Sequence, residues 1–195
     1  MRKTLFLLFM MLGITIVPVY GQAGSILDIV RDEEDLSTLS AALDLIDESL
    51  AEALDEDGPY TLLAPTNVAF ANVASALDVP IDDLLQNEAV LTQIVEYHII
   101  PGQISSVALE SRVGEVLPTL LSGAFVCINM RDNGVLAFNN VGDVVDGDQI
   151  ASNGVVHMVD DVLLNRVITE TLANPPVLPV GTPEATETES EPTDE

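Results

Sequence analysis

The sequence predicts a mixed α+β domain, because helical and strand patterns occupy different parts of the chain. In the first half, apolar residues recur every three or four positions, the spacing of an amphipathic helix. In the second half, short runs rich in valine and isoleucine alternate with Asn-Gly and Asp-Gly turn signals. Helices followed by strands favour an α+β fold over alternating βαβ units.

The first 23 residues have the features of a secretory signal peptide. Arg2 and Lys3 precede an apolar stretch at 5–17, and small residues follow up to Ala23. We therefore predict that 1–23 is cleaved and that the protein is secreted or associated with the cell surface. An uncleaved anchor is the alternative, although the stretch is shorter than the roughly 20 residues that a membrane span needs. No membrane insertion is expected after cleavage.

The next segment with a clear pattern is a helix at 36–54, which Asp35 is placed to cap. Two further helices are expected at 81–86 and 88–97. The residues that form the apolar stripe of the first helix, each worth about 1.5–3 kcal/mol when buried, are Leu36, Leu39, Leu43, Ile46, Leu50 and Leu54.

A short strand is expected at 60–63, because Pro65 cannot continue a central ladder. Either Thr66 or Asn67 is placed to cap a following short helix, which would carry Phe70 into the core.

The remaining strands are expected after the helices. Strands at 124–130 and 135–139 flank a hairpin turn that contains Asn133-Gly134, a pair that accepts positive φ. Further strands at 141–145 and 155–160 are expected to be separated by two turns. These turns are Asp146-Gly147-Asp148 and Ser152-Asn153-Gly154.

Three of these stretches, 60–70, 97–102 and 153–160, each pass from an apolar run to a turn or helix-start signal. In this order and at this spacing they resemble the two end motifs and the central tyrosine–histidine motif of the fasciclin domain, a secreted adhesion module. The resemblance covers nearly all of 25–164. One departure is Asn165, where many members have proline.

The resemblance implies a β-sandwich-like wedge of about seven strands flanked by several α-helices, which we assign to residues 24–172. It also implies a non-enzymatic adhesion role, with an extracellular protein or polysaccharide surface as the partner. Tyr97 and His98 correspond to the motif linked to integrin recognition in animal relatives, so they are the predicted partner-binding residues. The sequence leaves the partner's identity and the oligomeric state open.

A structural role is predicted for the remaining motif residues, namely Thr66, Asn67, Phe70, His157 and Asp160. The alternative is a small extracellular hydrolase or metal-dependent enzyme that uses His98 and His157. Both histidines lie within apolar stretches, where structural hydrogen bonds are commoner, and no catalytic, zinc or phosphate-binding signature accompanies them. We therefore expect no enzyme activity, no cofactor and no metal site.

The charge balance limits the possible partners. The chain has 32 Asp and Glu against six Lys and Arg, for a net charge of −26. Such a polyanion repels phosphate backbones, which excludes nucleic-acid binding. We interpret the acidic surface as a means of keeping the protein soluble. The alternative is that the acids bind calcium and that the protein is a calcium-responsive adhesin. The acids are scattered and the calcium-binding loop signature is absent.

The last segment, 173–195, is predicted to be a disordered acidic tail rich in Pro, Thr and Glu. Its prolines stiffen the exit at 175–179, and 182–195 has almost no apolar side chain to bury.

Overall fold

The computed structural model describes residues 24–46, 48–55, 58–78 and 80–173. The predicted signal peptide lies outside the described residues, and so does the predicted tail except for its first residue, Ala173.

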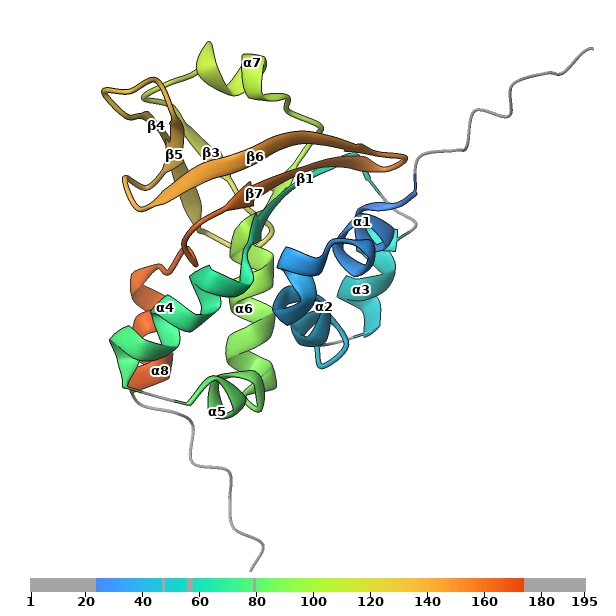
Figure 1. The fold of residues 1–195 in the computed structure, drawn as a ribbon, viewed down its shortest axis with the longest axis vertical. Helices are drawn as coiled ribbons and strands as arrows, with labels where there is room; N and C mark the ends of the chain where they lie inside the picture. The colour runs from blue at the N-terminus through green and yellow to red at the C-terminus, as the bar shows by residue number, and fades with distance from the viewer. Residues whose placement is uncertain (1–23, 47, 56–57, 79, 174–195) are drawn as a thin grey trace, which may run out of the picture.

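The described strands form one sheet that curls on itself (Figure 1). The strand order is β2-β1-β7-β6-β5-β4-β3, and all neighbours are antiparallel except the parallel pair β1–β7. A hydrogen bond from the Leu120 N–H to the Ile99 carbonyl, 2.9 Å, draws the two ends of the sheet together. The strands are β1 Tyr60–Pro65, β2 Ile99–Pro101, β3 Val116–Pro118, β4 Phe125–Met130, β5 Leu136–Phe138, β6 Gly142–Ala151 and β7 Gly154–Val159.

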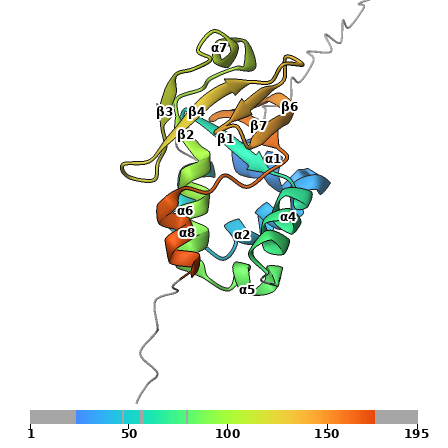
Figure 2. The ribbon, with the colours of Figure 1, turned by 90° about the vertical axis from the view of Figure 1, so that its left-hand side faces the viewer.

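Most helices gather at one end of the molecule, whereas α7 lies at the opposite end (Figures 1 and 2). The predicted α+β class and the predicted number of strands are confirmed in the described part of the chain. The helices are α1 Ile26–Asp32, η1 Glu34–Leu36, α2 Ser37–Leu43, α3 Glu48–Asp55, α4 Asn67–Leu77, α5 Ile81–Leu85, α6 Glu88–His98, α7 Ser106–Glu110 and α8 Arg166–Ala173.

The parallel pair β1–β7 forms the centre of the core. Every residue of β7 is buried, as is every residue of β1 except the half-buried Tyr60. A strand covered on both faces loses the alternation of polar and apolar residues, which explains the continuous apolar runs at 61–65 and 154–159. Pro65 is the last residue of β1 and pairs with Val159, the last residue of β7. Its missing N–H therefore removes no hydrogen bond from the middle of the β1–β7 ladder.

The prediction of one helix over 36–54 is wrong. The chain breaks after Leu43 and forms two helices, α2 and α3, which both pack against α1. The stripe leucines Leu36, Leu39 and Leu54 are still buried, so the spacing identified the core face correctly. Asp35 does not cap the helix, because it lies within η1 and the N-cap position of α2 is Leu36.

The turn expected at Asp146-Gly147-Asp148 is also wrong, because β6 continues through it. The register between β6 and β7 shifts here, which marks a β-bulge. Asp148 adopts the left-handed conformation, with φ 58°. The Asp-Gly pair therefore produces a local kink that stays hydrogen-bonded to β7.

We predict that Gly154→Ala destabilises the domain by about 3 kcal/mol or more, because a β-carbon there would collide with the Tyr60 carbonyl and lie 2.8 Å from Ile26 Cδ1. Gly102→Ala is the matched control. Its β-carbon would meet nothing within 4 Å, so only its left-handed backbone, φ +98°, adds a cost of about 1–2 kcal/mol. Urea unfolding checks both values, and equal losses would contradict this account.

Candidate functional site

His98, in the last turn of α6, is buried and bonded at both ring nitrogens. Its Nδ1 lies 2.7 Å from the Ile94 carbonyl oxygen and must donate to it. Its Nε2 then accepts from the Leu163 N–H at 2.9 Å. The ring is therefore neutral, with its proton on Nδ1, and it ties α6 to the segment after β7. Complete burial lowers the pKa of His98 to about 4, although the bond to Ile94 partly opposes the shift.

Tyr97 precedes His98 and is 3% exposed. Its hydroxyl donates to the Phe125 carbonyl oxygen at 3.0 Å and accepts from Asn139 Nδ2 at 2.9 Å. Burial raises the pKa of Tyr97, and the Asn139 bond partly offsets this. The Tyr97 ring meets the His98 ring edge-on, with centroids 6.3 Å apart. Tyr97 therefore joins the end of α6 to β4 and the turn after β5.

A shallow hollow of about 300 Å³ lies beside this corner. Tyr97, the loop from Leu121 to Phe125, Asn165 and Arg166 line it. The Tyr97 and His98 side chains themselves are buried, so the groups that a partner would meet first include Phe125, which is 55% exposed, and the exposed Arg166. Partner binding by Tyr97 and His98 stays a prediction.

His157, in the middle of β7, is bonded in the same way but with the opposite tautomer. Its Nδ1 accepts from the Asp148 N–H at 3.1 Å, and its Nε2 lies 2.9 Å from the Ile104 carbonyl oxygen and donates to it. Ser106 donates to the Asp148 carboxylate through both its N–H and its hydroxyl. His157 thus ties the bulge of β6 and the start of α7 to the central strand.

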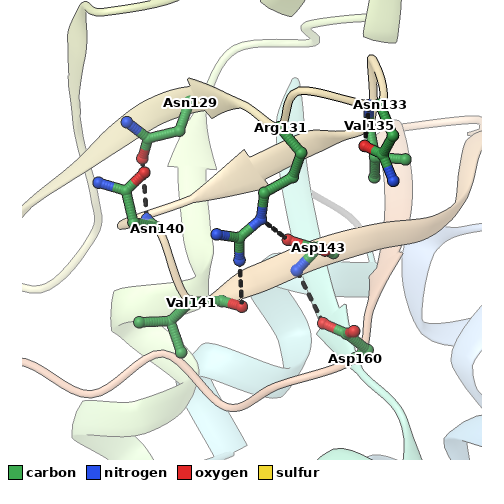
Figure 3. A network of polar contacts seen from close by, with 8 residues as sticks. All are labelled: Asn129, Arg131, Asn133, Val135, Asn140, Val141, Asp143 and Asp160. Carbon is green, nitrogen blue, oxygen red and sulfur yellow. Dashed lines mark hydrogen bonds and ion pairs between the residues drawn. The ribbon is translucent and has the colours of Figure 1, made fainter.

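Asp160 belongs to a polar network at the corner of β4, β5, β6 and β7 (Figure 3). Its Oδ1 accepts from the Asp143 N–H at 2.7 Å. The Asp143 carboxylate in turn pairs with Arg131 Nε at 2.5 Å, and Arg131 also donates to the Val141 carbonyl at 3.1 Å. Although Asp160 is exposed, a hydrogen bond from a backbone N–H to a carboxylate is charge-assisted and stronger than one between neutral groups. Asp160 therefore holds the end of β7 against β6.

Thr66, Asn67 and Phe70 hold the start of α4. Thr66 is the N-cap of α4, because its hydroxyl accepts from the Ala69 N–H at 3.3 Å, and Phe70 is buried. Asn67 has a different role, because its Oδ1 accepts from the Thr38 N–H at 2.8 Å and so caps α2 from a distant part of the sequence.

Two asparagines to whose side chains the sequence analysis assigned no role have similar contacts. Asn153 accepts from the Ile26 N–H at 2.8 Å through its side chain and donates to the Leu54 carbonyl at 2.9 Å, which links α1 and α3 to the turn between β6 and β7. Asn139 has φ 54° and accepts from the Cys127 N–H at 2.9 Å. Asparagine tolerates positive φ, so the Asn139-Asn140 pair was the available signal.

These contacts share one pattern, since the polar side chains of the three motifs bond mainly to backbone groups far away in sequence. Within the described ranges, no group of three or more His, Cys, Asp and Glu side chains is placed to hold a metal ion. Among those same residues, no helix has the length and apolar content to cross a membrane.

Comparisons with known proteins show which family has this sequence and this fold. Residues 34–165 match the Fasciclin domain. The chain is 37% identical to Protein sll1483 of Synechocystis sp., over 73% of this chain and 74% of that protein. It is 38% identical to the cell surface glycolipoprotein MPB83 of Mycobacterium bovis, over 66% of this chain and 55% of that protein.

A solved structure shows the same fold. It is the FAS1 domain pair of the insect cell adhesion molecule Fasciclin I, with a TM-score of 0.53 and 22% identity, over 65% of this chain and 44% of that chain. The chain belongs to the fasciclin domain family, as the resemblance in its motifs predicted.

The His98 contacts predict a pH-dependent stability. The neutral ring is favoured in the folded state, so its contribution is complete above pH 6.5 and is lost as the pH falls toward 4. At about 1.4 kcal/mol per pH unit, the total loss is about 3 kcal/mol. Glu96 and Asp161, whose pKa values are raised by burial, act in the opposite direction. The measured quantity is therefore the difference in unfolding free energy between wild type and His98→Gln.

We expect His98→Gln to be less stable than wild type at pH 7 and to approach it between pH 6.5 and 4. Urea unfolding at several pH values measures this difference. A difference that stays constant with pH would contradict the assigned protonation state.

The cap supplied by Asn67 gives a second prediction. Asn67→Ala removes the bond to Thr38 and two donor bonds, to the Glu34 carbonyl and the Ser37 hydroxyl, both 3.0 Å. We expect a loss of about 1–2 kcal/mol, the cost of a lost N-cap. The exposed Asn72 of the same helix is the control, and Asn72→Ala should change the free energy of unfolding by less than about 0.5 kcal/mol. An equal effect of both changes would argue against the cap.

Proposed function

We propose that this protein is a secreted or cell-surface, non-enzymatic adhesion module that binds an extracellular protein or polysaccharide. The proposal rests on the hydrogen bonds of the two histidines. In each ring, both nitrogens are bonded to backbone groups. A general base or a metal ligand needs a free imidazole nitrogen. Neither ring offers one without breaking a buried hydrogen bond.

The names of similar proteins support the adhesion role. One relative is called a cell surface glycolipoprotein, and the solved structure with the same fold comes from a cell adhesion molecule. The hollow beside Tyr97 is the proposed contact site, because it combines an exposed aromatic ring, Phe125, with the cation of Arg166. Aromatic and arginine side chains are enriched at binding hot spots.

The charge of the chain favours neutral or basic partner surfaces. The four arginines of the described residues all pair with carboxylates, whereas most acids in that same part of the chain have no arginine partner; the arginines are Arg31, Arg112, Arg131 and Arg166. Electrostatic attraction speeds association with a basic partner and weakens with salt. A single domain with so shallow a hollow binds weakly, so adhesion would depend on display in several copies.

The test compares monomeric protein with a streptavidin-displayed tetramer on intact cells and extracellular polymers of the producing organism. We expect the tetramer to be retained at least about 100-fold longer than the monomer, the gain that multivalent display provides. Phe125→Ser should reduce retention, because Phe125 is exposed at the hollow. Ile150→Ser, at a side chain that is 65% exposed on β6, is the matched control.

Two results would count against the proposal. One is that neither the monomer nor the tetramer is retained on cells or polymers at any salt or calcium concentration. The other is a hydrolytic activity that disappears in a folded His157→Gln variant, which would favour an enzyme. Retention that is equal in both serine variants would leave the adhesion role standing and move the contact site away from the hollow.

A further inference from the structure

A second and larger hollow lies at the helical end of the molecule, away from the Tyr97 corner. It has a volume of about 550 Å³ and is lined by Leu45, Leu85, Gln86 and Glu88. Leu45 follows α2 and is 49% exposed, and Leu85 is half-buried at the end of α5. Both leucines therefore leave part of their apolar side chains uncovered in the recess, beside the polar Gln86 and Glu88.

The described chain ends at the same, helical end of the molecule as this recess (Figure 1). Asn165 and Arg166, at the start of α8, share the smaller hollow with Tyr97 at the end of α6. From there α8 packs along α6 and runs away from the sheet (Figure 2). At 1.5 Å per residue, α8 advances about 10 Å before Ala173. The backbone of Ala173 thus reaches about the level of the first turn of α6, the turn in which Glu88 lines the recess.

The segment that follows has a composition that suits the recess. Residues 174–183 contain no charged side chain, and 175–180 reads Pro-Pro-Val-Leu-Pro-Val. Leu178 is five residues beyond Ala173, a reach of about 15 Å in an extended chain. The three prolines restrict the backbone before binding, which lowers the entropy lost on docking.

We propose that residues 175–180 bind back onto the hollow between α2, α5 and α6, with Leu178 against Leu45 and Leu85. The electrostatics favour this occupant over a second copy of the chain. Another copy brings a net charge of −26 toward a body of the same charge, whereas 175–180 is neutral and already tethered. The first acid of the segment, Glu184, comes only after this neutral stretch. Docking would therefore hold the acidic residues 184–195 at the helical end, away from the Tyr97 hollow.

Methyl NMR on the full chain with labelled leucine and valine tests the proposal. We expect nuclear Overhauser contacts between the Leu178 methyls and those of Leu45 and Leu85, unchanged on tenfold dilution. Leu178→Asp and Leu45→Ser should each abolish them. Val68→Ser, at a 64% exposed position on α4, should leave them intact.

Three outcomes would overturn the proposal. Leu178 methyls that relax like a free chain, with no contact to either leucine, would exclude docking. Contacts that appear only in a sample mixed from two differently labelled chains would assign the recess to a second copy. Contacts that survive Leu45→Ser would place the segment elsewhere. Because the readout is intramolecular, it is independent of whether the protein adheres to any partner.

Discussion

The fold depends on the need to hold the buried parallel pair β1–β7 in place between two layers. Parallel neighbours require a long connection, and here the strands β2 to β6 and the helices α4 to α7 lie between the two strands in sequence. Such a topology brings together segments that are distant along the chain, and their buried backbone groups must find partners. His98, His157, Asn153 and Asn67 supply these partners across 29 to 127 positions of sequence separation.

This role explains why polar residues occur within apolar runs. A buried neutral side chain whose polar atoms are all hydrogen-bonded adds neither an unpaired charge nor an unsatisfied polar group to the core. The tyrosine–histidine pair of α6 acts in this way at one corner, and the bulge of β6 with His157 does so at another. The acidic side chains, in contrast, are mostly exposed on the described surface.

The sequence predicted those features that depend on local patterns. The strand at β7, the helix at α6 and the turn at Asn133-Gly134 follow from spacing and turn chemistry, and the family follows from three motifs in order. The break between α2 and α3 was not predictable, because the apolar spacing continues across it and both helices pack against α1 only in the folded chain. The cap from Asn67 to α2 and the kink that keeps Asp148 bonded to His157 likewise depend on contacts that form only in the folded state.

The central claim is that both imidazoles are neutral, are hydrogen-bonded to backbone groups at both ring nitrogens, and have fixed and opposite tautomers. Nitrogen-15 NMR of the histidine rings at neutral pH measures this directly, because protonated and unprotonated ring nitrogens have very different shifts. The account predicts a proton fixed on Nδ1 of His98 and on Nε2 of His157. Averaged shifts at the two nitrogens of either ring, which indicate free exchange between tautomers, would contradict it.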